Sequence, residues 1–404
     1  MTKTFIVRFI AVVFIFSGLG AAAYATFKSS DSVDKNIVFS DRTLLSGLWD
    51  NYKKVYWEKD TGRTLDKQQD NMTTSEGQSY TMLRAVWQSD RSTFDKSWAW
   101  TKEQLDRPQD ELFAWRWGKK TDGAYGIMTD QGGQNTASDA DSDIALALVM
   151  AANRWQQQSY LDQANLIIKD IWKQEVITVK NTPYLVSNNL EKDSQKPAII
   201  NPSYLAPYAY RIFAKVDKTN DWNKLVSSSY DVINTSMTDN LDKNSSAVIV
   251  PDWIAVDKTT GQIGAVKDAP TLTTNYGFDA MRTPFRLALD YKWYKDERAK
   301  DTVSRMSFFK KQWQEKGKIM STYSHDGKSV KNEEVAETYA TLLGYFSIID
   351  PSLGSEIYDK KLKPLYNPDT NSWENEMTYY GDNWAWFGIA LHENKLDNIA
   401  ADLR

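Results

Sequence analysis

Residues 137–155 read ASDADSDIALALVMAANRW, and they combine a dense acidic start with an apolar continuation. The acids stand at alternate positions, Asp139, Asp141 and Asp143. From Ile144 onward, apolar residues recur at the spacing of a helix that is buried on one side. One interpretation is a helix cap followed by a solvated first turn, because carboxylates favour helix N-termini. The other places carboxylates at the rim of a cavity.

The three aspartates do not fit the common acidic metal motifs. A calcium loop of the EF-hand type begins D-x-D-x-D but needs Gly at its sixth position and Glu at its twelfth. Counted from Asp139, those positions hold Ile144 and Met150. An Asp-rich helix that grips Mg²⁺ and a diphosphate would need a Gly-rich phosphate loop or a Lys/Arg cluster nearby, and the sequence has neither there. We therefore predict no metal and no cofactor.

The composition argues against several classes of protein. The chain has 404 residues, of which 41% are hydrophobic, enough for one large core or two modest ones. A net charge of −4 without any Lys/Arg block argues against a nucleic-acid partner. Cysteine is absent, which leaves no disulfide and no thiolate nucleophile. His325 and His392 are isolated, which argues against a Ser-His-Asp triad and a His-rich metal site.

Aromatic residues are frequent, with 16 Trp and 21 Tyr. Many lie among polar residues, as at Trp115-Arg116-Trp117 and Tyr379-Tyr380. Such side chains present a flat apolar face with a polar edge, and the apolar faces of sugar rings stack on surfaces of this kind. A carbohydrate groove is therefore a natural use for them, although we expect about half to be buried in helix contacts.

The N-terminus has the pattern of a targeting segment. Lys3 and Arg8 precede an apolar run over residues 9–27, and Ala23-Tyr24-Ala25 is a small-residue cleavage pattern. The run barely reaches the length that spans a bilayer, so a cleaved secretory signal and an uncleaved anchor both stay open.

These features divide the chain into three parts. Residues 1–28 are the signal peptide or membrane anchor, residues 29–36 are a polar linker, and residues 37–404 are one catalytic domain. We expect an extracytoplasmic protein, either secreted or held at the outer face of the cell membrane by residues 9–27. Membrane contact is expected only through this segment.

Amphipathic helical patterns recur from the linker to the end of the chain. They cover residues 44–55, 80–87, 92–105, 144–155, 160–172, 204–216, 222–233, 282–294, 302–313, 334–346 and 384–391, with a weaker one around Ser355. Residues 177–186 and 246–266 have the pattern of short strands. Helix pairs without a repeated sequence motif fit an all-α barrel with a few short β-strands in its loops, and a solenoid of short repeats is the alternative.

Two further blocks carry candidate catalytic carboxyl groups. Hydrolysis of a glycoside by the usual route needs two of them, one protonated to assist the leaving oxygen and one ionised. Residues 73–83, TTSEGQSYTML, offer Glu76 beside Gly77, where a ligand can approach the backbone closely. The spacing from Thr73 to Glu76 also fits a capping box, in which Glu76 would bind the backbone at the helix start.

The second block is residues 275–286, NYGFDAMRTPFR. Asp279 stands near the start of a predicted helix, and Arg282 follows three residues later. The two could form an ordinary i,i+3 ion pair. In a cleft, the same arginine would keep the carboxylate ionised and oriented, which a general base requires.

Residues 137–155 together with these two blocks resemble glycoside hydrolase family 8, and the resemblance extends along most of the chain after the N-terminal segment. It implies a single-domain (α/α)6 barrel and an inverting mechanism. Glu76 would be the general acid and Asp279, with Arg282 beside it, the general base. Asp139 would orient the nucleophilic water or contact the central sugar, supported by Asp141. Inversion implies carboxyl groups about 6.5–9.5 Å apart.

The resemblance also implies residues that bind the substrate. Trp115 and Trp117 match a block where the family has an aromatic sugar platform, and a core role is expected for one of the two. Tyr379 and Tyr380 lie in a C-terminal block, YYGDN, that would close the groove. Tyr276 and Arg282, in the second carboxylate block, and Asp141, in the first acidic stretch, are further predicted substrate-binding residues.

We therefore expect a monomeric, inverting endo-glycosidase that cuts β-1,4 linkages of a polysaccharide, such as a bacterial exopolysaccharide or a β-glucan. The first alternative is a non-catalytic polysaccharide-binding or export accessory protein, which the presence of all three carboxylates disfavours. The second is a polysaccharide lyase on a similar barrel. A lyase must neutralise a uronate, and no basic cluster is present to do so.

Overall fold

The computed structural model describes residues 41–403, so the predicted targeting segment 1–28 and the linker 29–36 lie outside the described residues. Within this range the α-helices are α1 (Asp41–Tyr56), α2 (Ser75–Gln88), α3 (Arg91–Gln104), α4 (Ser138–Trp155), α5 (Gln158–Glu175), α6 (Leu190–Asp193), α7 (Pro207–Val216), α8 (Trp222–Thr238), α9 (Arg282–Tyr294), α10 (Glu297–Arg305), α11 (Ser307–Lys316), α12 (Ala336–Ile349), α13 (Pro351–Ile357) and α14 (Tyr379–His392). None of these helices has both the length and the apolar character needed to cross a membrane.

The strands are short and pair mostly as local antiparallel ladders. They are β1 (Trp57–Glu58), β2 (Arg63–Thr64), β3 (Thr73–Thr74), β4 (Arg116–Lys119), β5 (Tyr125–Ile127), β6 (Val176–Val179), β7 (Thr182–Leu185), β8 (Ala198–Ile200), β9 (Ile254–Val256), β10 (Ile263–Gly264), β11 (Thr322–Tyr323), β12 (Ser329–Lys331), β13 (Tyr366–Asn367) and β14 (Ser372–Trp373). The β6–β7 hairpin and the β9–β10 pair confirm the two strand regions that the sequence predicted.

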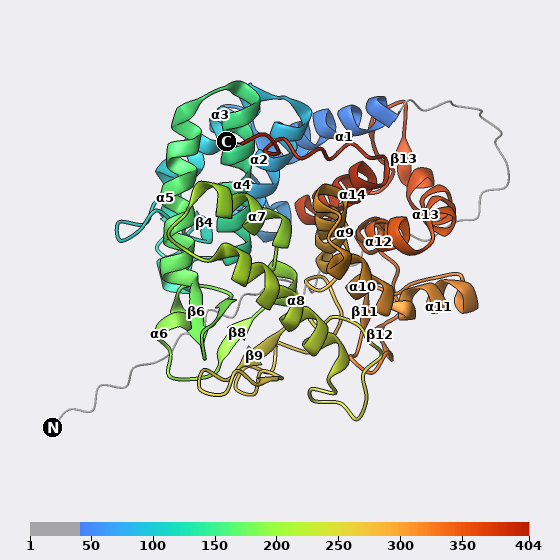
Figure 1. The fold of residues 1–404 in the computed structure, drawn as a ribbon. Coiled ribbons are helices and arrows are strands. Elements are labelled where there is room, and N and C mark those ends of the chain that lie inside the picture. Colours follow the sequence, from blue (N-terminus) through green and yellow to red (C-terminus); the bar gives the residue numbers. More distant parts are fainter. Residues whose placement is uncertain (1–40, 404) are drawn as a thin grey trace.

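The helices form a closed double ring (Figure 1). In the described part of the chain, α2 packs on α4, α4 on α7, α7 on α9, α9 on α12, α12 on α14, and α14 returns to α2. The neighbouring helices α1, α3, α5, α8, α10 and α13 each pack against a member of this inner ring. This arrangement confirms the predicted (α/α)6 barrel, and the contact between α14 and α2 rules out an open solenoid.

The inner helices are apolar on more than one face because both the barrel interior and the outer helices cover them. In α4, the residues from Ser138 to Ala152 are all buried. The side chains that remain polar in this environment are paired across the ring. Arg286 of α9, for example, binds both carboxylate oxygens of Asp143 in α4, at 3.0 and 2.8 Å.

Some predicted element limits were wrong, and the backbone explains why. The pattern over residues 204–216 contains Pro207, and the chain forms a short 3₁₀ turn, Pro202–Tyr204, before α7 begins at that proline. The pattern over residues 302–313 is divided at Met306 into α10 and α11. Two short helices replace the single predicted one.

The first turns of the inner helices meet at one end of the barrel. Glu76 lies in the first turn of α2 and Asp139 in that of α4. Arg282 is the first residue of α9, and Tyr379 is the first residue of α14. Hydrogen bonds connect these four side chains, so residues from four distant parts of the sequence share one site.

Candidate active site

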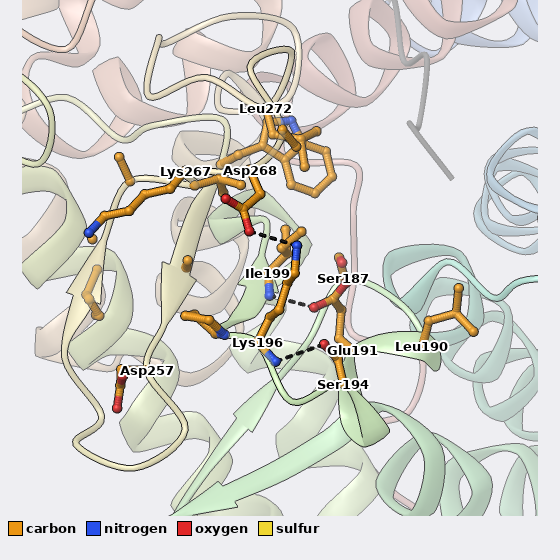
Figure 2. Close-up of a pocket in the computed structure, with 18 of the residues that line it drawn as sticks. Ser187, Leu190, Glu191, Ser194, Lys196, Ile199, Asp257, Lys267, Asp268 and Leu272 are labelled. Atoms are coloured by element: carbon orange, nitrogen blue, oxygen red, sulfur yellow. Dashed lines mark hydrogen bonds and ion pairs between the residues drawn. The ribbon is translucent and has the colours of Figure 1, made fainter. Parts of the chain in front are cut away.

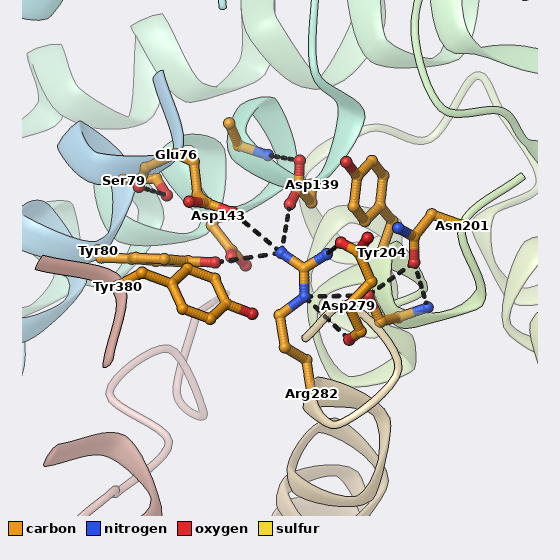
Figure 3. A network of polar contacts seen from close by, with 12 residues as sticks. Glu76, Ser79, Tyr80, Asp139, Asp143, Asn201, Tyr204, Asp279, Arg282 and Tyr380 are labelled. Atoms are coloured by element: carbon orange, nitrogen blue, oxygen red, sulfur yellow. Dashed lines mark hydrogen bonds and ion pairs between the residues drawn. The ribbon is translucent and has the colours of Figure 1, made fainter. Parts of the chain in front are cut away.

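The centre of the site is Arg282, whose side chain is fully buried (Figure 3). Its Nη1 donates to Glu76 Oε2 at 3.1 Å and to Asp139 Oδ2 at 3.0 Å. Its Nη2 donates to Asp279 Oδ1 at 2.6 Å. A single guanidinium thus connects all three carboxylates that the sequence singled out as catalytic.

Other residues hold this guanidinium in place. Its Nε donates to Ser203 Oγ at 3.0 Å, and its Nη1 also reaches the Tyr80 hydroxyl at 3.3 Å. The Tyr204 ring lies against it, with 5.0 Å between the guanidinium carbon and the ring centroid. Because the planar fork of donors has a fixed shape, these contacts also fix the directions from which the carboxylates approach.

Glu76 is held at both of its carboxyl oxygens. Oε2 binds Arg282, and Oε1 accepts a hydrogen bond from the Tyr379 hydroxyl at 2.9 Å. Burial raises the pKa of Glu76 to about 7; the charge of Asp139 adds to this effect, while Arg282 and Tyr379 oppose it. The capping-box interpretation is wrong here, because Thr74 rather than Thr73 caps α2 and the Glu76 side chain points to Arg282.

Asp279 lies in the turn before α9. Burial raises its pKa to about 6, and the charge of Asp139 adds to this effect, while Arg282 and the nearby Asn201 and Trp253 side chains oppose it. The sequence predicted that Arg282 would keep this group ionised. Arg282 does act in that direction, but the effect of burial is larger.

Asp139 faces the same guanidinium and does not cap α4. The helix begins after Ala137, which makes no side-chain cap, and Asp139 accepts from the neighbouring Ala140 N–H at 2.9 Å. Burial raises the pKa of Asp139, while Arg282 and Arg286 lower it.

Asp141 points away from this cluster. Its side chain is fully buried, accepts from the Phe113 N–H at 3.1 Å and lies beside the carboxyl group of Glu175. Burial raises the pKa of Asp141 to about 8. The carboxyl group of Asp141 therefore lies between α4 and the end of the outer helix α5, on the side of α4 away from the Asp139 cluster.

A narrow pocket opens over Glu76 and Asp139. Its lining includes Gln69, Met72, Thr74, Ser75, Trp115, Thr136, Ala137, Ser187, Tyr204, Tyr379 and Tyr380. Trp115, Tyr379 and Tyr380 are thus placed as the sequence suggested for substrate contacts. Tyr380 is held by a hydrogen bond from its hydroxyl to the Phe278 carbonyl oxygen.

Two predicted substrate-binding aromatics do not line this pocket. The Trp117 ring packs against Trp100, with 5.3 Å between centroids, and under the guanidinium of Arg63. Tyr276 is fully buried against Phe309, with centroids 4.7 Å apart. Of the pair Trp115 and Trp117, only Trp115 is therefore in position to meet a sugar in the pocket.

A larger groove of about 770 Å³ adjoins the pocket at Ser187, which lines both (Figure 2). Ile199 of β8, Ala255 of β9 and Ile263 of β10 belong to its lining, as does Trp253. Lys196 and Asp268, which also line it, form an ion pair at 2.7 Å. The site thus consists of a tight acidic pocket that continues into a wide groove.

Sequence reasoning did not identify several residues that touch the acidic cluster, namely Ser203, Tyr204, Asn201 and Trp253. Three of them lie in the run Asn201-Pro202-Ser203-Tyr204, a polar turn directly before a helix. This turn lies just before an inner helix, and the other site residues also lie at helix starts. Its position in the sequence could therefore have identified these three residues as candidates for the site. Trp253 stands in a loop, and no local pattern distinguishes it.

Comparison with known proteins agrees with this geometry. The family model described as glycosyl hydrolases family 8 matches residues 17–391. Endoglucanase A of Acetivibrio thermocellus is 27% identical over 315 residues, which are 76% of this chain and 58% of that protein. The Escherichia coli K12 endoglucanase is 31% identical over 239 residues, 58% of this chain and 60% of that protein. The chain therefore spans about three fifths of the length of these relatives.

Solved structures share the fold. An endo-1,4-D-glucanase from Vibrio fischeri ES114 superposes with a TM-score of 0.73 at 25% identity, covering 86% of this chain and 95% of that one. An endoglucanase from Komagataeibacter sucrofermentans has the same fold, with a TM-score of 0.66 at 19% identity over 89% of this chain and 99% of that one. By sequence and by fold, this chain belongs to glycosyl hydrolase family 8.

Proposed function

We propose that this protein is an inverting endo-glycosidase that hydrolyses β-1,4 linkages within a polysaccharide. The observation that carries the proposal is that Glu76 and Asp279 bind different terminal nitrogens of Arg282 and differ in proton affinity. The pKa of Glu76 is about 7 and that of Asp279 about 6. Between these values, Glu76 is mostly protonated and Asp279 mostly ionised, which suits a general acid and a general base.

The proposed reaction is a single displacement. Asp279 removes a proton from a water molecule, and the water oxygen attacks the anomeric carbon of the sugar. Glu76 gives its proton to the glycosidic oxygen as the bond from that oxygen to the anomeric carbon breaks. Tyr379 orients the Glu76 carboxyl group. Asp139 binds the same guanidinium as Glu76 and Asp279, so it is placed to position the sugar or the water that lies between those two carboxyl groups.

The shape of the site supports a polymeric substrate. The narrow pocket has Glu76 and Trp115 in its lining, and the adjoining groove of about 770 Å³ has room for several sugars of one chain. The relatives named endoglucanases make a β-1,4-glucan the first substrate to test.

We also propose that the enzyme acts outside the cytoplasm, where a bacterial exopolysaccharide is a candidate substrate. The support is the apolar segment 9–27 and its position directly before the catalytic domain. An anchored enzyme would trim polymer made by its own cell more readily than distant biomass. N-terminal sequencing of the mature protein tests the anchor, because cleavage after Ala25 would contradict it.

The central experiment measures new reducing ends. Wild type, Glu76→Gln and a matched control, Glu103→Gln on the exposed face of α3, are incubated with β-1,4-glucans, xylan, chitosan and crude bacterial exopolysaccharide. We expect wild type and the control to release reducing ends from at least one polymer and Glu76→Gln to be slower by at least 10²-fold, the lower end of the usual contribution of a general acid. Nuclear magnetic resonance of the fresh product should show the inverted anomer.

Two outcomes would contradict this function. Retained binding without release from any polymer would favour a non-catalytic binding protein. Release that is equally fast with Glu76→Gln would show that Glu76 is not the proton donor.

A further inference from the structure

The turn that carries Asp279 precedes α9 and has no side-chain cap of its own. Met281 stands at the cap position of α9 and makes no side-chain cap hydrogen bond. Arg282 binds the Asp279 carboxylate directly, and the position of Asp279 also depends on the contacts that hold residues 275–280. On one side, Tyr276 exchanges two backbone hydrogen bonds with Tyr323, at 2.8 and 2.9 Å.

On the other side, the contacts come from Asp252, which lies just before β9. Asp252 Oδ1 accepts from the Gly277 N–H at 3.0 Å and from the Ala280 N–H at 2.8 Å. These two residues flank Asp279 on both sides. The Asp252 N–H also donates to the Asn275 carbonyl oxygen at 2.6 Å.

The close approach of Asp252 also explains Gly277. A Cβ atom at position 277 would lie 2.6 Å from Asp252 Oδ2, a separation that atoms in contact do not adopt. Glycine is thus required here by the carboxyl group next to it and not by an unusual backbone angle.

The segment around Asp252 reaches Asp279 a second time through its neighbour. The Trp253 side chain lies beside the Asp279 carboxylate and lowers its pKa, and the Trp253 N–H donates to the Thr273 carbonyl oxygen at 3.1 Å. Burial and the charge of Asp279 raise the pKa of Asp252 well above its ordinary range, although Arg282 opposes this effect.

We propose that Asp252 is a positioning residue for the reaction: its carboxyl oxygen binds the backbone on both sides of Asp279 and so sets where the base points. The inference rests on the proposed role of Asp279 as the base. It predicts that the turn depends on an oxygen acceptor at position 252.

The test compares Asp252→Ala and Asp252→Asn in the full chain, with the steady-state constants measured on the best polymer from the panel above. Loss of the acceptor should lower kcat by about 10²-fold, the usual effect of displacing a catalytic group by about 1 Å, with KM changed less than about threefold. Asp252→Asn keeps an oxygen acceptor and should recover kcat to within about fivefold of wild type.

A matched control separates position from stability. Asp217 is also an aspartate outside the helices and strands, and it accepts hydrogen bonds from the Thr219 N–H and the Trp222 indole. Asp217→Ala should lower the thermal midpoint without lowering kcat. A second variant, Gly277→Ala, pushes the Asp252 carboxyl group away without removing it and should lower kcat as Asp252→Ala does.

The possible failures are distinguishable. Inactive wild type would contradict the proposed function itself. Active wild type together with Asp252→Ala within threefold of its kcat would overturn the positioning role, and so would equal losses in folded Asp252→Ala and Asp252→Asn. If Asp252→Ala does not fold, the kcat of Gly277→Ala is the deciding measurement. A kcat equal to that of wild type in Gly277→Ala would overturn the proposal.

Discussion

At the scale of single residues, the site has more carboxylates than positive charge. Glu76, Asp139 and Asp279 all bind Arg282, and all three are buried. If all were ionised, the cluster would carry a net charge of −2 in a poorly solvated place, which is costly. A proton held within the cluster relieves this, and Glu76, with a pKa of about 7, is the group that binds it in the proposed mechanism.

This distribution of protons predicts a bell-shaped pH dependence of kcat/KM. Activity should rise as the pH passes about 6, because Asp279 must lose its proton to act as the base. It should fall as the pH passes about 7, because Glu76 must keep its proton to act as the acid. Initial rates between pH 4 and 9 on a soluble polymer test this. A rate that stays high above pH 8 would contradict the assignment of Glu76.

The raised pKa of Glu76 also predicts a gain in stability when the group is removed. An acid whose pKa is raised in the folded state stabilises that state at low pH, and this stabilisation is lost as the pH rises from 4.5 through about 7. Gln cannot ionise, so Glu76→Gln should be more stable than wild type at pH 8 by roughly 1–3 kcal/mol. At pH 4 the two should be nearly equal.

Urea unfolding at both pH values measures this difference. The exposed substitution Glu103→Gln is the control and should show no pH-dependent gain. A Glu76→Gln variant that gains nothing between pH 4 and pH 8 would mean that the folded protein does not hold a proton on Glu76.

At the scale of secondary structure elements, α4 and α9 are joined by two parallel arginine–aspartate contacts. Asp139 binds Arg282, and one helical turn further Asp143 binds Arg286. Both pairs of positions are four residues apart, which places them on the same face of each helix. The inner pair, Asp143 and Arg286, lies one helical turn below the active site. It holds together the same helix faces that carry the outer pair, Asp139 and Arg282.

Removing the inner pair should destabilise the barrel. Arg286 is 1% exposed, so Asp143→Ala would leave a buried guanidinium without its carboxylate. We expect a loss of about 3–5 kcal/mol in the free energy of unfolding, measured by urea titration. The control is Glu356→Ala, which breaks the exposed pair with Lys360 and should cost less than about 1 kcal/mol. An Asp143→Ala loss as small as that of the control would contradict a structural role for the inner pair.

At the scale of the whole molecule, closure of the ring brings the narrow pocket and the wide groove together. The groove is built from β8, β9, β10 and the loops beside them, whereas the pocket is built from the starts of α2, α4 and α14. A polysaccharide chain that occupied both would gain binding energy far from the bond that is cleaved. Such remote binding energy can be used to raise the rate for long substrates.

Blocking the groove should therefore affect long substrates more than short ones. Gly264 lines the groove, and a Cβ at this position would meet no atom within 4 Å. Gly264→Trp should lower kcat/KM on polymer by about tenfold, a loss of about 1.4 kcal/mol. It should leave the shortest cleaved oligosaccharide nearly unaffected. Gly126→Trp, at another open strand position outside both cavities, is the control, and equal losses on long and short substrates would contradict a binding role for the groove.

The sequence alone determined the helical character of the chain, the three acidic blocks and their likeness to one family. These are local properties: apolar spacing follows from the helix period, and the blocks are short continuous motifs. The resemblance gave the active-site role to Asp139 and a supporting role to Asp141, but local spacing could not show that Asp141 points away from the cluster. Residues two apart on a helix point in nearly opposite directions, so which of them faces the pocket depends on how α4 sits in the ring.

Only the tertiary structure decided that the ring closes and which side chains meet inside it. The contact between α14 and α2 and the placing of Tyr379 on Glu76 join residues about 300 positions apart. Asp252 and Tyr204 belong to no acidic block, and their contacts with the site come from loops that the packed helices bring together. The raised pKa values of Glu76 and Asp279 follow first from burial, which is a property of the folded barrel and not of any stretch of its sequence.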